Sequence, residues 1–259
     1  MIYYLLRLLE PILTLTNIFY QNQFFSISYY TLCFLLAFVT IFFTTHHTNK
    51  AFHVSSKITT EITLILVASG LLGGRLGHIL FYDISYFSSH PNEIFALWHG
   101  GLSSFGAFVL GGMTLYFYGG RRNWWLHCDF VVLHIPIMIF FVRIGNFINH
   151  EIVGKNFYDL LPTMLVSVEG KTEIIVPIVL YEAFLCGLVL FLTLLSVHKR
   201  LQRGMLTVYF LFLYSIMRFP LECFKPDEKV GLGLNISQLF SLVLLVWSIL
   251  LYVRIKKIQ

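Results

Sequence analysis

Seven long apolar segments constrain the fold of this chain more than any other feature of its sequence. They lie at about residues 25–43, 59–82, 100–118, 129–148, 177–197, 205–224 and 236–253. As a helix, each segment is long enough to cross about 30 Å of hydrocarbon. Charged residues make up only 12% of the chain, whereas soluble domains carry about 25%. We therefore expect an all-α integral membrane protein with seven transmembrane helices.

The remaining residues allow little beyond one membrane domain. Residues 1–24 contain Arg7, Glu10 and Pro11 among leucines and tyrosines, which favours an interfacial segment and a loop over a span. Residues 25–259 then form the membrane domain. Its longest polar connection, residues 151–175, is expected to be a small extramembrane head in which the segment KTEIIV forms a strand.

The charges of the loops indicate how the chain crosses the membrane. Basic residues without acidic neighbours occupy the connections after the first, third and fifth segments and the C-terminal tail: Lys50, Lys57, Arg121, Arg122, Lys199, Arg200, Arg203, Arg254, Lys256 and Lys257. In the opposite loops, acids offset the lysines. By the positive-inside rule the C-terminus is cytoplasmic and the N-terminus lies outside. The ends of the fourth and sixth segments and the start of the first then face the outer side.

Charge and cysteine content exclude several other classes. The net charge of +5 comes from residues scattered among loops, which does not indicate nucleic-acid binding. The four cysteines lie in or beside apolar segments without a CxxC spacing, so we expect buried thiols and neither disulfides nor a zinc site. The first twenty residues show no cleavable signal peptide.

A polar cluster ends the fourth apolar segment, in the stretch RIGNFINHEIVG at residues 143–154. On a helix, Arg143 and Asn146 share one face, and Asn149 and His150 lie roughly on the same side. These donors suit a phosphate or carbonyl head group, and a charge at membrane depth is by default functional. The alternative is an arginine that snorkels to the interface and holds lipid phosphates non-specifically.

Two further arginines lie in apolar segments. Arg75 follows two glycines, and Arg218 lies four residues before Glu222 and four after Tyr214. Arginine binds phosphate in a bidentate way, although Arg218 and Glu222 could also neutralise each other as a structural pair. Three buried arginines exceed the acids at comparable depth, because Glu151 lies near the interface. We therefore expect an anionic lipid head group as the missing partner.

Five stretches in this order and spacing resemble the phosphatidylglycerol–prolipoprotein diacylglyceryl transferase family: GGRLGHILFYD, WHGGLSSFGA, RIGNFINHEIVG, LYE and YSIMRFPLECFKPD. The resemblance covers about residues 28–241, and RIGNFIN followed by glutamate and glycine is its most diagnostic part. It implies a seven-span protein of the bacterial inner membrane with a periplasmic N-terminus and head. It also implies transfer of the diacylglyceryl group of phosphatidylglycerol to the lipobox cysteine of a prolipoprotein, with release of glycerol phosphate. No metal or organic cofactor is implied.

The resemblance also implies roles for individual residues. Two arginines hold the lipid phosphate, and two tyrosines match tyrosines of the family. The expected catalytic residues are Arg143, Arg218, Tyr30 and His150. The expected substrate-binding residues are Arg75, Arg143, Asn146, Asn149, Glu151, Gly154, Tyr214, Arg218 and Glu222. The reaction needs positive charge on the departing phosphate and a base that makes the thiolate.

This sequence departs from the family pattern chiefly where the thiol is activated. Phe105 stands where the family has a histidine, and Val176 and Val179 replace a histidine and a glutamine. Lys225 replaces an arginine, and His150 replaces a glycine. His150, flanked by expected pocket residues, is the best-placed substitute base, since imidazole titrates near neutrality.

Three functions stay open at this point. The first is an active transferase with altered thiol activation. The second is a non-catalytic membrane protein that binds anionic lipid or lipoprotein. The third is a related transferase with another acceptor. His78 and His99 are further candidates for the base, and each of these histidines could also be an ordinary solvated residue.

Overall fold

A computed structural model describes residues 18–21, 26–81, 83–95, 101–149, 154, 164–168, 171–225, 229–230 and 233–258. Of residues 18–28, 104, 121–122, 164–175 and 258, at most the backbone is described. The chain divides into two compact units. The first unit contains Met1–Phe43 and Val132–Gln259, and the second contains Thr44–Val131. Each unit is described by itself.

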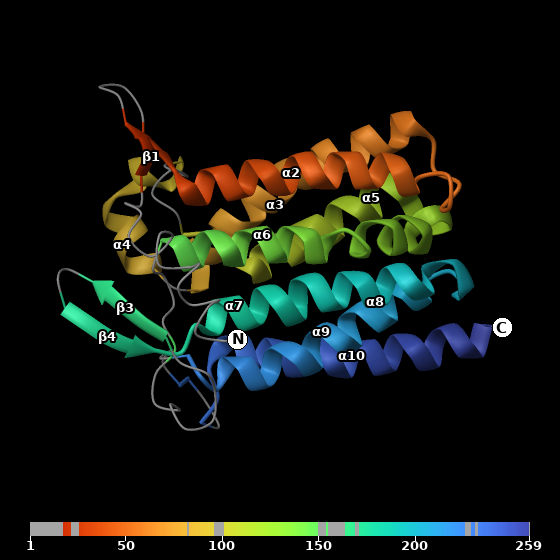
Figure 1. The fold of residues 1–259 in the computed structure, drawn as a ribbon. Coiled ribbons are helices and arrows are strands. Elements are labelled where there is room, and N and C mark those ends of the chain that lie inside the picture. Colours follow the sequence, from red (N-terminus) through yellow and green to blue (C-terminus); the bar gives the residue numbers. More distant parts are fainter. Residues whose placement is uncertain are drawn as a thin grey trace. The chain divides into compact units, whose positions relative to one another are not determined.

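The described chain is almost entirely helical (Figure 1). Six of its helical segments are long and apolar enough to cross a membrane: Tyr29–Thr48, Ser56–Phe81, Asn123–Ile148, Ile178–Arg200, Met205–Glu222 and Ile236–Lys257. The all-helical membrane class is therefore confirmed, with six candidate spans in the described part of the chain. Only helices and closed barrels satisfy all backbone polar groups in hydrocarbon, which explains why these sequences become helices.

The third expected span accounts for the difference between seven and six. It falls in α5 (Ser104–Val132), where Gly120 adopts a left-handed conformation with φ 59° and interrupts the helix. Residues 104–119 alone are shorter than the other candidate spans. The helical residues after this kink continue through a turn at Leu133 and His134 into α6 (Ile135–Ile148).

The other helices of the first unit pack against one another in two groups. α6 contacts α7 (Ile178–Glu182) and the π-helix η3 (Ala183–Val189), which continues into α8 (Leu190–Val197) and the short η4 (His198–Arg200). α9 (Met205–Glu222) lies along α10 (Ile236–Ile258), as Figure 1 shows. α2 (Tyr29–Thr48) begins four residues later than predicted, because Ser26–Ser28 form a strand instead.

Two antiparallel strand pairs accompany these helices. β1 (Ile18–Gln21) pairs with β2 (Ser26–Ser28), and β3 (Met164–Val168) pairs with β4 (Lys171–Ile175) in the register Met164 to Ile175. The strand predicted for KTEIIV is thus confirmed. Residues 1–17, expected to be interfacial, lie outside the described residues.

The second unit depends on close helix packing at glycines. It contains α3 (Ser56–Phe81), the short helices α4 (Ile84–Ser89) and η1 (Pro91–Phe95), and most of α5. A Cβ atom added to Gly77 would lie 2.8 Å from Cα of Gly106, and Gly73 makes a similarly close approach to the same residue. Small residues at helix interfaces allow such contacts in membranes, so Gly106 permits the close packing of α3 against α5.

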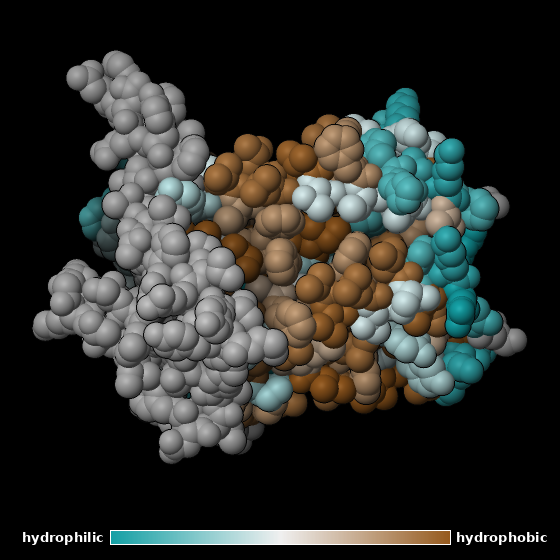
Figure 2. Space-filling view, in the orientation of Figure 1, coloured by the Kyte–Doolittle hydropathy of each residue, from teal (hydrophilic) through white to brown (hydrophobic). Residues whose placement is uncertain are grey.

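Large apolar side chains are exposed on many of the described helices, as expected of surfaces that face lipid. Large apolar residues such as Phe43, Phe117 and Leu250 expose 62–76% of their surface, and Figure 2 shows that hydrophobic residues cover much of the described surface in this view. The interior, in contrast, holds ionisable groups, among them Glu182 and Glu222. Buried charges inside a membrane bundle are rare and by default mark a functional site.

Candidate functional site

A fully buried carboxylate lies at the centre of an ion cluster in the first unit. Glu182 ends α7, and its side chain has no exposed surface. Arg143 Nε lies 2.8 Å from its Oε2, while Arg218 Nη1 and Lys225 Nζ lie 3.0 and 2.9 Å from its Oε1. A buried carboxylate is costly unless cations and donors surround it. These contacts explain how Glu182 is tolerated inside the bundle.

Arg143 reaches Glu182 from the end of α6. Its Nη1 donates a hydrogen bond of 3.2 Å to Oδ1 of Asn146, so the two side chains share a helix face as their spacing predicts. Its side chain is 14% exposed, compared with 8% for Arg218 and 3% for Lys225. Arg143 is therefore the most accessible cation of the cluster.

The end of α9 supplies both a second carboxylate and two cations. Arg218 and Glu222 lie one helical turn apart, and Arg218 Nη2 is 2.8 Å from Oε1 of Glu222. Lys225 follows the helix, and its Nζ lies 2.7 Å from the same oxygen. Oε2 of Glu222, in contrast, is buried and accepts no hydrogen bond from any described residue.

The ion cluster (Arg143, Glu182, Arg218, Glu222 and Lys225) carries an excess of positive charge. Three cations face two carboxylates, which leaves one positive charge uncompensated among the described residues. Lys225 lies beyond the last residue of the α9 span, and burial lowers its pKa. The two arginines lower the pKa further, whereas the carboxylates of Glu182 and Glu222 raise it.

The π-helix η3 helps to bring Arg143 and Glu182 of the cluster together. η3 begins directly after Glu182, and π segments occur frequently at functional sites. A Cβ atom at Gly187 of η3 would lie 2.7 Å from Cβ and 2.8 Å from Cα of Phe140 in α6. Because Gly187 has no side chain, α6 and η3 approach closely, and Arg143 on α6 comes within reach of Glu182.

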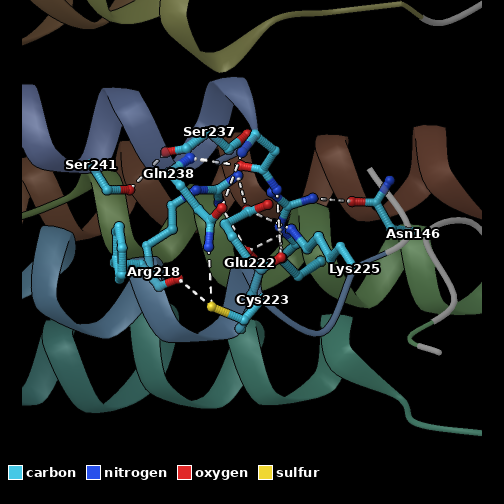
Figure 3. Close-up of polar contacts among 12 residues, drawn as sticks. Asn146, Arg218, Glu222, Cys223, Lys225, Ser237, Gln238 and Ser241 are labelled. Atoms are coloured by element: carbon cyan, nitrogen blue, oxygen red, sulfur yellow. Dashed lines mark hydrogen bonds and ion pairs between the residues drawn. The ribbon is translucent and has the colours of Figure 1, made fainter. Parts of the chain in front are cut away.

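The start of α10 packs against the end of α9 beside the cluster (Figure 3). Asn235 precedes α10, and its Oδ1 accepts a hydrogen bond of 2.7 Å from the N–H of Gln238. Oε1 of Gln238 in turn accepts a hydrogen bond of 3.0 Å from the N–H of Asn235. This reciprocal pair is a capping box, with asparagine and glutamine in the two roles.

Several other predicted site residues lie near this cluster in the first unit. Tyr214 is 3% exposed and its ring stacks on that of Phe210. The centroid of the Tyr214 ring lies 5.8 Å from the guanidinium carbon of Arg218. Tyr30 packs against Gly145, which precedes Asn146: a Cβ atom there would lie 2.9 Å from Cδ2 of Tyr30.

The predicted residues at the end of α6 are only partly described. Asn149 caps α6 and donates its N–H to the carbonyl of Gly145. Gly154 pairs with Val176, and a Cβ atom at Gly154 would lie 2.8 Å from the carbonyl oxygen of Val176. His150 and Glu151 lie outside the described residues.

Arg75 belongs to the second unit, where its guanidinium donates hydrogen bonds to main-chain carbonyls. Nε donates to the carbonyl of Ile94 at 2.9 Å, and Nη2 donates to that of Glu93 at 2.6 Å. The guanidinium carbon also lies 4.8 Å from the ring centroid of Phe87. Arg75 thus holds the connection between α3 and α5 in place, and its role in substrate binding stays a prediction.

The second unit also contains the candidate bases outside the signature stretch. His78 Nε2 lies 3.0 Å from Oδ2 of Asp83, and both side chains are partly exposed. Phe105 is 7% exposed at the start of α5. His99 lies outside the described residues. A histidine paired with a carboxylate is oriented for proton transfer, so His78 stays a candidate.

Two residues of the ion cluster are absent from the site expected from the sequence. Glu182 lies mid-chain in an apolar segment, and an acid at membrane depth is itself a signal that could have selected it. Lys225 was noted only as a substitution for arginine. Its contact with Glu182 joins residues 43 positions apart, and no sequence spacing encodes such a contact.

The candidate spans and the buried ion cluster define a polytopic membrane protein with a cationic site at one end of its helices. A family model described as prolipoprotein diacylglyceryl transferase matches residues 17–254. The chain belongs to this family, and the resemblance of its motifs is confirmed.

Relatives in three organisms bear the name phosphatidylglycerol–prolipoprotein diacylglyceryl transferase. The protein of Nitratidesulfovibrio vulgaris strain DP4 is 38% identical over 183 residues, 68% of each chain. That of Desulfotalea psychrophila is 34% identical over 219 residues, 80% of this chain and 79% of the relative. That of Geobacter sulfurreducens is 32% identical over 222 residues, 83% of this chain and 84% of the relative.

Proposed function

We propose that this protein transfers the diacylglyceryl group of phosphatidylglycerol to the lipobox cysteine of prolipoproteins, the first step of lipoprotein maturation. The observation that carries the proposal is the positive excess of the ion cluster, in which Arg143, Arg218 and Lys225 face only two carboxylates. A phosphodiester brings one negative charge and balances this excess. Membership in the family supplies the reaction class.

In this proposal the phosphate binds at the accessible edge of the cluster. Arg143 is its most exposed cation, and the planar guanidinium suits a phosphate in a bidentate way. Arg218 lies behind it, linked through Glu182. Asn146, Asn149, Glu151 and Gly154 complete the head-group pocket.

The free oxygen of Glu222 supports a hydroxylated head group. Its Oε2 is buried without a hydrogen bond from any described residue, and buried carboxylate oxygens nearly always have a partner. A hydroxyl of the head-group glycerol is a suitable donor. The proposed substrate-binding set also includes Tyr214, whose ring stacks on Phe210 and lies near the guanidinium of Arg218, and Arg75.

The proposed reaction is a displacement at the glyceryl carbon. The cysteine sulfur forms a thioether bond to that carbon, the bond from the same carbon to the phosphate oxygen breaks, and glycerol phosphate leaves with the electron pair. Arg143 and Arg218 stabilise the charge of the departing phosphate. We assign Tyr30 to the reacting centre and His150 to acceptance of the thiol proton.

The proposed setting is the bacterial inner membrane, with a periplasmic N-terminus and a cytoplasmic C-terminus. Residues 104–119 form the third span and bring the number of spans to seven. Residues 1–24 form an interfacial segment, and residues 151–175 form a periplasmic head on the membrane domain of residues 25–259. Because the ends of α6 and α9 then face the periplasm, both the lipid and the translocated prolipoprotein have access to the cluster.

The test uses purified protein in vesicles with a lipobox peptide and either phosphatidylglycerol or phosphatidylethanolamine as the only lipid. We expect glycerol phosphate release and a lipid-modified peptide in the phosphatidylglycerol vesicles and neither product in the phosphatidylethanolamine vesicles. Arg143→Ala is expected to abolish turnover while the protein still inserts into membranes. Full activity of Arg143→Ala would contradict the phosphate site, and lipid binding without turnover by any thiol peptide would favour a non-catalytic binding protein.

A further inference from the structure

The end of α9 carries two members of the ion cluster on an intrinsically weak turn. Pro220 lies inside the helix and has no N–H to donate. Beyond it, the N–H groups of Cys223, Phe224 and Lys225 bond to carbonyls three residues back, at 3.1, 3.2 and 3.3 Å. Hydrogen bonds of this 3₁₀ type have poorer geometry than those of an α-helix. Glu222 and Lys225 therefore need support from outside α9.

Two amide side chains at the start of α10 supply this support (Figure 3). Asn235 Nδ2 donates to the carbonyl of Glu222 at 3.5 Å, and Gln238 Nε2 donates to Sγ of Cys223 at 3.0 Å. Asn235 and Gln238 are only 4% and 5% exposed. Water competes little for the buried hydrogen bond of Asn235, while that of Gln238 is partly buried because Cys223 is exposed.

Each of the two amide side chains thus makes hydrogen bonds to both α9 and α10. The oxygens of Asn235 and Gln238 cap α10, while their N–H groups hold the last residues of α9. We propose that Asn235 and Gln238 are positioning residues that keep Glu222 and Lys225 in the ion cluster, beyond their role as the cap of α10. This inference rests on the proposed function, because it assigns the cluster a reaction to support.

The cluster tolerates little movement of this turn. Lys225 Nζ bridges the carboxylates of Glu182 and Glu222 at 2.9 and 2.7 Å. A displacement of about 1 Å breaks such contacts, and misplacement on this scale costs enzymes about 10²-fold in rate. The positions of Asn235 and Gln238 should therefore affect turnover although neither side chain belongs to the cluster.

The experiment separates support of α9 from capping of α10. Asn235→Ser keeps an oxygen acceptor at the N-cap, where serine is favourable, and removes the donor to Glu222. Cys223→Ala removes the Sγ acceptor and leaves the capping box intact. Ser241→Ala is the matched control, because Ser241 is 1% exposed and its hydroxyl donates to Ser237 of its own helix at 2.9 Å.

Four readouts are compared between the double variant Asn235→Ser/Cys223→Ala and the control. We expect glycerol phosphate release to fall about tenfold or more while the melting temperature matches that of Ser241→Ala. The alkaline limb of the pH–rate profile should move to higher pH, because burial lowers the pKa of Lys225 and a loosened turn is less buried. The charged groups that surround Lys225 (Glu182, Glu222, Arg143 and Arg218) are present in both proteins.

The fourth readout is the rate at which an amine reagent labels Lys225, followed by mass spectrometry. Lys225 is 3% exposed, so labelling should rise about tenfold in the double variant and stay constant in the control. Wild-type activity and labelling in the double variant would overturn the inference, as would an activity loss that only tracks unfolding. If the wild type itself releases no glycerol phosphate, the proposed function fails, and labelling still decides whether the two amides hold the turn.

Discussion

Replacement of Glu182 by glutamine tests the central carboxylate of the ion cluster. Glutamine preserves the shape of the side chain and removes its charge, so three cations then face the single carboxylate of Glu222. Removal of one partner from a buried ion pair costs about 3–5 kcal/mol. For a chain of this size, 1 kcal/mol corresponds to about 2–4 °C in melting temperature. We therefore expect Glu182→Gln to melt about 6–20 °C below the wild type.

The assay is thermal unfolding of purified protein in vesicles that contain no anionic lipid. Glu61→Gln is the control, because the Glu61 side chain is 42% exposed, its contact with Lys57 is a surface ion pair at 4.0 Å, and glutamine can still accept the hydrogen bond from Tyr118. Such a pair contributes at most about 1 kcal/mol, so this variant should melt within a few degrees of the wild type. A Glu182→Gln protein that melts as the wild type does would refute the view that this carboxylate compensates the buried cations.

Phosphatidylglycerol provides a second test of the same reasoning. A ligand that binds only the folded state raises its stability, and the loss of Glu182 enlarges the positive excess that a phosphodiester can balance. We therefore expect phosphatidylglycerol to raise the melting temperature of Glu182→Gln more than that of the wild type. Equal shifts in the two proteins would indicate that the lipid does not bind at the ion cluster.

Three further substitutions test separate parts of the site. Activity should decline on the alkaline side below the ordinary titration range of lysine, since burial lowers the pKa of Lys225, and Lys225→Arg should move this decline to higher pH; an unchanged limb would exclude Lys225 as its source. Gly187→Ala should lower stability by about 1–3 kcal/mol and reduce turnover, because a Cβ atom there meets Phe140, whereas Gly112→Ala, with no atom within 4 Å, should change neither property. Phe105→His should raise turnover by supplying a proton acceptor, whereas Phe105→Asn should not; equal effects of the two would separate the change from proton transfer.

The spans were predictable because hydrophobicity must match the bilayer over a fixed length. The predicted segments at residues 177–197 and 205–224 agree closely with the helices Ile178–Val197 and Met205–Glu222. The break at Gly120 was not predicted, since the conformation of one glycine has no signature in the apolar pattern. The π-helix η3 was missed for the same reason, because its sequence is that of an ordinary apolar helix.

Within the site, the contacts along one helix were predictable and those between helices were not. The spacings of three and four residues predict that Arg143 lies beside Asn146 and Arg218 beside Glu222, and both contacts are present. The meeting of these pairs at Glu182 depends on the close approach of α6 and η3 at Gly187. A one-dimensional pattern specifies which face a residue occupies, and it does not specify which helix that face meets.

The excess of positive charge was predicted from the sequence, but with different residues. In the sequence, three arginines (Arg75, Arg143 and Arg218) exceed the acids at comparable depth. In the structure, the guanidinium of Arg75 donates hydrogen bonds to the carbonyls of Glu93 and Ile94 in the second unit. Lys225 takes the third place in the cluster, opposite Glu182 and Glu222. The expected anionic partner therefore depends on a lysine whose charge varies with pH, so lipid binding should weaken at alkaline pH as Lys225 loses its proton.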